Sequence, residues 1–158
     1  MNLNLFFTPT DILLPAHADM RRWSVIACDQ FTADAGYWQA VQDTVGDAPS
    51  TLRLMLPEFY LGKCDEAAAT REIQQTMRRY LDDGVFRTVP HSLVLVQRTL
   101  PGGAVRCGVV GALDLEAYDY APDSVTPIRA TEGTVASRLP ARVRIRAAAA
   151  LEMPHIMV

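Results

Sequence analysis

Two apolar runs joined by a tight-turn sequence constrain this chain more than any other feature. The runs cover residues 92–98 and 104–113, and Thr99-Leu100-Pro101-Gly102-Gly103 lies between them. Strand-length apolar runs joined by a short segment rich in proline and glycine predict a β-hairpin, which we expect at the centre of a sheet. Gly108 and Gly111 lie inside the second run, where they favour a bulge or a close backbone approach.

Helical patterns precede the hairpin in the chain. Apolar side chains recur on one face of residues 66–83, with Asp65 as the predicted N-cap and Gly84 just beyond the end. A second helix is predicted over residues 34–45, and Gly46 suits its C-terminal end. The fold class is therefore α/β or α+β, a mixed sheet with a central hairpin flanked by these two helices.

Three further segments carry weaker patterns. Residues 23–28 are apolar and have the length of a buried strand, which would place Asp29 at its end. Residues 52–56 alternate in polarity, so they are predicted to be a short extended segment. Pro140 suits the first turn of a helix that we expect to continue to about Leu151.

Length and composition are those of an ordinary globular protein. The chain has 158 residues, of which 49% are hydrophobic and 21% charged, and this predicts a single domain over 1–158. No apolar run approaches the 18 residues or so that a membrane helix needs, and the first residues lack signal-peptide features. Cys28, Cys64 and Cys107 are odd in number and far apart, so we expect free thiols and a cytoplasmic protein.

Charge is distributed unevenly along the chain. Residues 1–128 hold 10 basic and 16 acidic side chains, a formal −6, whereas residues 129–158 hold five arginines and two glutamates, a formal +3. This asymmetry predicts a local anion site or a partner surface on an acidic body. The excess of 14 arginines over one lysine is by itself better explained by GC-rich codon usage. The overall charge of −3 argues against nucleic acid as a partner.

Arginine, threonine and glutamate side chains gather near the C-terminal end. Guanidinium forks and hydroxyl groups bind phosphate oxygens, so the predicted substrate-binding residues are Arg129, Thr131, Thr134, Arg138 and Arg142. Glu132 and Asp29 are the predicted catalytic residues, each as a base or a magnesium ligand, and the identity of any metal stays open. The alternative is that each arginine forms a structural ion pair with Glu132, Glu152 or Asp29.

Long motifs resemble the amino-terminal half of the bacterial and archaeal "domain of unknown function 1015" family. They span essentially the whole chain, and they comprise residues 13–15, 23 with 25–32, 37–38, 45–54, 57–58 with 60–61, 114–120, 128–135 and 151–158. Ala141 departs from this resemblance, because members often carry a second proline there. Members are roughly twice this length or more, and residues 155–158 are typical of the first half of a buried strand. We therefore expect the chain to be the N-terminal fragment of a longer protein.

Members of the family have no established activity, so the resemblance implies no particular reaction. The later half of such proteins carries an Asp-Gly-His-His-Arg-type motif similar to one in the ParB and sulfiredoxin-like fold, which includes free-serine kinases. Family genes also tend to lie near serine-biosynthesis genes. That motif is absent from this sequence. A Glu-x-Thr motif followed by an arginine in broader members corresponds to Glu132, Thr134 and Arg138, and the resemblance implies that these three lie in a pocket.

Two functions of different classes follow. In the first, the chain is part of a phosphoryl-transfer, kinase-like enzyme that acts on a free amino acid or its phosphate ester. The candidate cofactor of this enzyme is ATP or ADP with magnesium. The second is a non-catalytic module that senses an anion or contacts another protein. In both cases the expected partners are a small-molecule anion and the remainder of the full-length chain, with no membrane.

Overall fold

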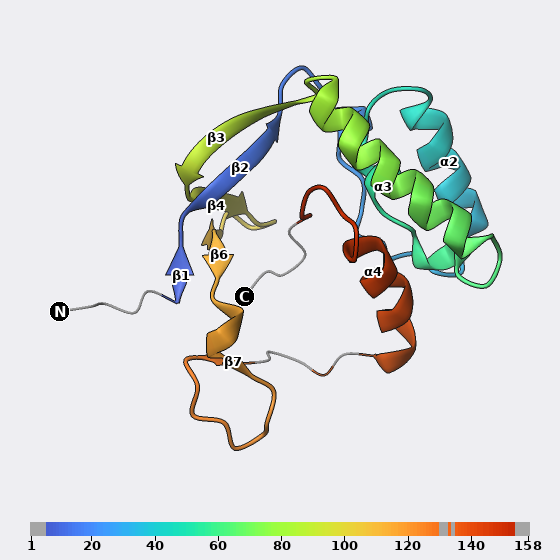
Figure 1. The fold of residues 1–158 in the computed structure, drawn as a ribbon. Coiled ribbons are helices and arrows are strands. Elements are labelled where there is room, and N and C mark those ends of the chain that lie inside the picture. The colour runs from blue at the N-terminus through green and yellow to red at the C-terminus, as the bar shows by residue number, and fades with distance from the viewer. Residues whose placement is uncertain (1–5, 130–132, 134, 154–158) are drawn as a thin grey trace. The chain divides into compact units, whose positions relative to one another are not determined.

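The computed structural model describes residues 6–129, 133 and 135–153. It combines helices and short strands, which confirms the α+β class (Figure 1). The chain divides into two compact units. The first contains residues 1–14, 88–134 and 153–158, and the second contains residues 15–87 and 135–152. The predicted strand at 155–158 lies outside the described residues.

Short strands paired two by two characterise the first unit. The strands are β1 (Phe7–Thr8), β2 (Thr10–Pro15), β3 (Phe86–Ser92), β4 (Val94–Thr99), β5 (Val105–Val110), β6 (Ala112–Leu113), β7 (Tyr118–Asp119) and β8 (Ile128–Arg129). They form the sheets β1–β6, β2–β3, β4–β5 and β7–β8 in the described part of the chain. The pairs β1–β6 and β4–β5 are antiparallel, and β7–β8 is parallel.

The predicted hairpin is confirmed as β4 and β5. Val94 lies opposite Val110 and Thr99 opposite Val105, and the turn between them uses positive φ angles of 95° and 86° at Gly102 and Gly103. The hairpin forms a sheet of its own among the described residues, because β3, the preceding strand in the chain, pairs with β2.

Gly111 shows the close approach that its place in the sequence favours. A Cβ atom at this position would lie 2.6 Å from Leu93 Cδ2 and 2.7 Å from both Phe7 Cζ and the Thr8 carbonyl oxygen. No larger residue fits there without a shift of the surrounding chain. Gly111 therefore allows β1 and β6 to pair directly after the hairpin.

Helices form the second unit. They are α1 (Met20–Trp23), α2 (Ala35–Val45), α3 (Glu66–Asp82) and α4 (Leu139–Arg146), with the 3-10 turns η1 (Thr51–Leu54), η2 (Glu58–Tyr60) and η4 (Ala136–Arg138); a further 3-10 turn, η3 (Leu115–Ala117), belongs to the first unit. Both long predicted helices are confirmed. The Asp34 carboxylate accepts the Tyr37 N–H at 2.9 Å, and Asp65 accepts two N–H groups of α3 at 3.0 Å.

Three predicted elements differ from the structure. Residues 23–28 are not a strand. Trp23 is the last residue of α1, and its carbonyl accepts hydrogen bonds from the Ser50 and Thr51 hydroxyls, at 3.3 and 2.8 Å, where a strand would accept an N–H of a neighbouring strand. Residues 51–54 form the turn η1, which Ser50 caps. The last helix, α4, ends at Arg146 and stops short of Leu151.

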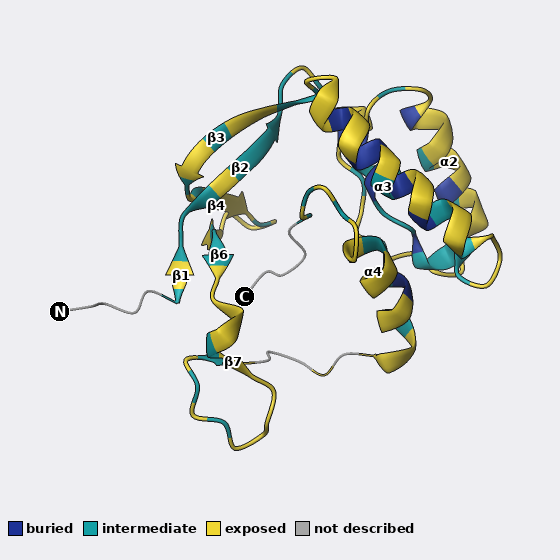
Figure 2. Cartoon of the chain, in the orientation of Figure 1, coloured by how far each residue is buried: buried dark blue, intermediate teal, exposed yellow. Residues whose placement is uncertain are grey.

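Buried positions of the second unit lie on α2, α3 and α4 (Figure 2). Its buried apolar residues are Trp23, Trp38, Val45, Leu54, Ile73, Met77, Tyr80 and Ala141. The Trp23 ring packs edge-on against Phe86, with the ring centroids 5.5 Å apart. Ser50 is fully buried among these side chains, and its backbone N–H donates to the Tyr80 hydroxyl at 3.1 Å. One buried hydrogen bond thus joins α3 to the segment before η1.

Replacing Tyr80 by phenylalanine is expected to destabilise the chain. The substitution removes the only oxygen that accepts the buried Ser50 N–H among the described residues, and an unsatisfied buried donor costs about 1–3 kcal/mol. Urea unfolding should therefore show a lower free energy of unfolding by that amount. Tyr118→Phe, at an exposed position, is the matched control and should change it by less than about 0.5 kcal/mol. Equal effects of the two substitutions would contradict this role of Tyr80.

Candidate functional site

A short loop after α1 positions the first part of the site. The Cys28 carbonyl accepts the backbone N–H of Glu58 at 2.8 Å, so the loop is tied to the start of η2. Three residues on, the Phe31 carbonyl accepts the indole N–H of the buried Trp38 at 3.0 Å. Asp29 lies between these two anchored carbonyls and is held in place although it belongs to no helix or strand.

Helix α4 and the turn before it supply the basic side chains. Pro140 lies in the first turn of α4, where its missing N–H costs nothing. The Gln74 amide of α3 donates to the carbonyls of Arg144 and Ile145, at 2.9 and 3.0 Å, and so holds the end of α4 against α3. Arg138 and Arg142 are four residues apart, which places them on one side of this segment.

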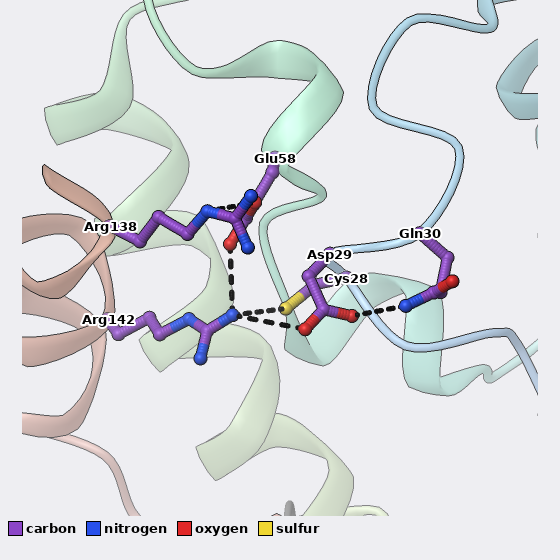
Figure 3. Close-up of polar contacts among 6 residues, drawn as sticks. All are labelled: Cys28, Asp29, Gln30, Glu58, Arg138 and Arg142. Carbon is purple, nitrogen blue, oxygen red and sulfur yellow. Dashed lines mark hydrogen bonds and ion pairs between the residues drawn. The ribbon is translucent and has the colours of Figure 1, made fainter. Parts of the chain in front are cut away.

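Glu58 contacts both Arg138 and Arg142 (Figure 3). Its Oε2 is 3.1 Å from Nε of Arg138, and its Oε1 is 2.9 Å from Nη2 of Arg142. Its side chain is only 8% exposed, whereas each arginine side chain is 42% exposed. A nearly buried carboxylate therefore fixes two guanidinium groups that still reach solvent.

Two more residues complete what we call the Glu58 cluster, which consists of Cys28, Asp29, Glu58, Arg138 and Arg142. Nη2 of Arg142 lies 3.6 Å from Oδ2 of Asp29 and 4.0 Å from Sγ of Cys28. The other Asp29 oxygen accepts the Gln30 amide at 3.1 Å. Two carboxylates thus balance two guanidinium groups, and the cluster has no net charge while Cys28 is a thiol.

The cluster shifts the pKa of two of its members. Burial raises the pKa of the Cys28 thiol, and the charges of Asp29 and Glu58 raise it further, while Arg142 opposes them. For Arg142, burial alone would lower the pKa, but the Cys28 sulfur, Glu58 and Asp29 outweigh it and raise the pKa above its ordinary value. At neutral pH the thiol is therefore protonated and Arg142 is charged.

Several N–H donors of the arginine pair have no acceptor within the part of the chain that the structure describes. Arg138 binds Glu58 through Nε alone, so both of its Nη groups keep their hydrogens available. Arg142 uses only Nη2, which leaves Nη1, and its Nε is buried without a hydrogen-bond partner. Because the Arg142 Nε is buried, the donors that a ligand could reach are the Nη groups of the two half-exposed arginine side chains.

The structure brings together three of the seven site residues predicted from the sequence. Arg138, Arg142 and Asp29 meet at the Glu58 cluster. Arg129 belongs to the first unit, where its Nε donates to the Thr126 carbonyl at 3.3 Å. Thr131, Glu132 and Thr134 lie outside the described residues.

Sequence reasoning missed Glu58 as a site residue and placed Asp29 at the end of a strand that the structure does not contain. Glu58 is 84 residues from Arg142 in the chain, so no spacing pattern connects them. The available signal was its place after Pro57 in one of the family-like motifs. Arg142 lies within ion-pair distance of Asp29, one of the partners that the structural alternative named. Arg146, outside the predicted site, pairs with Glu152 at 2.6 Å.

The described residues contain no group of three or more histidine, cysteine, aspartate or glutamate side chains that could hold a metal ion. Asp29, with a side chain 35% exposed, is the accessible carboxylate of the cluster. All three cysteines are free, as predicted, with Cys28 half-buried and the other two exposed. Among the helices described, none is both long and apolar enough to span a bilayer.

The fold and the cluster define an α+β protein with a partly buried arginine–carboxylate site. A family model described as "Protein of unknown function (DUF1015)" matches residues 9–158. The chain therefore belongs to this family, as its motifs predicted. No curated protein and no solved structure matches it significantly.

Glu58→Gln is expected to lower the free energy of unfolding by about 1–3 kcal/mol, because it removes the charge that two guanidinium groups share at a nearly buried position. Urea unfolding measures the change. The matched control is Glu152→Gln, which disrupts the exposed pair with Arg146 and should cost less than about 1 kcal/mol. If the two substitutions had the same small effect, Glu58 would not organise the cluster.

Cys28 is expected to react slowly with iodoacetamide. The thiolate is the reacting form, so a raised pKa and partial burial both reduce the rate relative to the exposed Cys64. Peptide mass spectrometry after timed alkylation should show Cys64 modified first at pH 7. The Cys28 rate should still be rising at pH values above the ordinary thiol pKa. Alkylation of Cys28 as fast as Cys64 at pH 7 would contradict the raised pKa.

Proposed function

We propose that the Glu58 cluster binds a small anion and that the chain is part of a phosphoryl-transfer enzyme acting on a free amino acid or its phosphate ester. One observation carries the proposal: a nearly buried carboxylate orients two half-exposed guanidinium groups whose remaining N–H donors have no acceptor in the described residues. Pre-oriented arginine forks are well suited to carboxylate and phosphate oxygens.

The balanced charge of the cluster favours a particular ligand chemistry. Because Glu58 and Asp29 offset Arg138 and Arg142, affinity depends on directed N–H donors and not on an excess of positive charge. A free amino acid is a zwitterion and fits such a site. Its carboxylate or phosphate would bind the guanidinium groups, and its ammonium group would lie toward Asp29.

The catalytic part of the proposal rests on carboxylates. Asp29 is accessible and already beside Arg142, so it is the proposed base or magnesium ligand, together with Glu132. One or two protein carboxylates suffice for magnesium when substrate phosphates complete its shell, so Asp29 fits an ATP or ADP complex of magnesium. The same proposal includes three further points. The protein is related to free-serine kinases of the ParB and sulfiredoxin-like fold, it is cytoplasmic, and its activity requires the remainder of the full-length chain.

A second candidate is a module that binds its anion without turnover. The ion pairs among Asp29, Glu58 and the two arginines favour it, because side chains held by balanced charges form a rigid site that can bind an anion without reacting with it. Turnover distinguishes the two candidates.

Titration of the full-length protein with ATP, ADP and phosphoserine by calorimetry tests the anion site. At least one of these ligands should bind, and Arg138→Lys should weaken it by roughly ten-fold or more, because lysine keeps the charge but loses the fork. Arg146→Lys, at the exposed pair with Glu152, is the matched control and should leave the affinity unchanged.

The same samples are then assayed for nucleotide turnover with and without free serine. Turnover that depends on Asp29 supports the enzyme, and binding without turnover supports the sensing module. No binding of any of the three anions, or equal binding by the Arg138→Lys and Arg146→Lys variants, would show that these arginines are structural.

A further inference from the structure

A groove in the second unit borders the Glu58 cluster at η2, since Pro57 and Tyr60 line it. It runs between α2, the segment after α2 and α3, and its volume is about 570 Å³, which is in the usual range for small-molecule sites. Its apolar lining includes the buried Val45 and Ile73 and the half-buried Leu52 and Leu56. None of the five cluster residues lines it.

The groove carries more acidic than basic side chains. Asp43, Asp47 and Glu72 line it, and within the described part of the chain none of the three has a basic group within 4 Å. Asp43 lies in the last turn of α2, and Asp47 directly follows Gly46, the residue that caps this helix.

The two arginines of the groove are engaged elsewhere. The Arg53 guanidinium donates to the carbonyls of Gly46 and Ala48, and so serves the end of α2. Arg79 donates to the hydroxyl of Thr76, which is almost fully buried. Neither arginine pairs with a carboxylate of the groove, and the lining keeps a net negative charge.

Gln42 adds a fixed acceptor. Its amide nitrogen donates to the Tyr60 hydroxyl at 2.7 Å, so its amide oxygen is directed away from that bond and is available to a donor. Asp43 accepts the Gln39 amide at 2.9 Å through one oxygen, and its other oxygen has no partner among the described residues. An apolar lining, carboxylates without basic partners and one oriented carbonyl oxygen are the features that recognise a positively charged nitrogen on a hydrocarbon body.

We propose that this groove binds an organic cation, namely a protonated amine or guanidinium group attached to an apolar body. The body lies against Leu52, Leu56 and Ile73, and the cationic nitrogen lies beside Asp43 and Asp47. The proposal is independent of the anion site, because it uses no residue of the Glu58 cluster.

Two probes with the same six-carbon chain, hexylammonium and hexanoate, test the proposal. Each is titrated into the ¹⁵N-labelled protein, and binding is followed by the shifts of amide signals in NMR spectra. Hexylammonium should shift groove amides in residues 43–47, 52–56 and 72–76 and saturate them, whereas hexanoate should bind at least five-fold more weakly. The double substitution Asp43→Asn and Asp47→Asn should weaken hexylammonium by roughly two-fold to thirty-fold, because it removes two exposed ion pairs.

Two variants make the outcome decisive. Asp123→Asn removes an exposed carboxylate of the first unit and should leave hexylammonium affinity unchanged. Ala69→Phe places a ring in the groove and should abolish binding while the thermal melting transition is retained. Any of three results would overturn the proposal. The two probes could bind with equal affinity, the shifts could be confined to residues outside the groove, or hexylammonium could still bind to both the double variant and the Ala69→Phe variant.

Discussion

The carboxylate of Glu58 connects three segments that are distant in the sequence. Its own backbone N–H is bonded to the loop at Cys28, and its side chain holds Arg138 and Arg142 of the C-terminal helical segment. A carboxylate that is 8% exposed is costly to bury unless it is paired. The guanidinium groups of Arg138 and Arg142 pair with this carboxylate, and Glu58 restricts the rotamers of both arginines. The position of Asp29 beside Arg142 follows from the same set of contacts.

The core beneath this cluster makes the arrangement possible. Ser50 and Thr51 donate to the Trp23 carbonyl, and Tyr80 accepts the Ser50 N–H, so the end of α1 and the segment before η1 are hydrogen-bonded without a sheet. Trp38 fixes the Phe31 carbonyl on the other side of Asp29. A loop that contains no helix or strand is thereby held by buried hydrogen bonds, which is how rigid scaffolds present functional side chains.

The second unit offers two surfaces of opposite character. The Glu58 cluster balances its charges but retains N–H donors, so it suits an anion or a zwitterion. The groove between α2 and α3 retains carboxylates without basic partners in the described chain, so it suits a cation. Both surfaces meet at η2, because Glu58 belongs to the cluster while Tyr60 lines the groove.

Local signals in the sequence determined α2, α3 and the β4–β5 hairpin, because caps, periodic apolar positions and a glycine turn act within a few residues. The family also followed from the motifs alone. Tertiary structure decided that residues 24–28 are irregular, since Ser50 and Thr51 take the bonds that a neighbouring strand would have made. It also selected Glu58 as the partner of Arg138 and Arg142, because a contact across 84 residues depends on packing that no local pattern records.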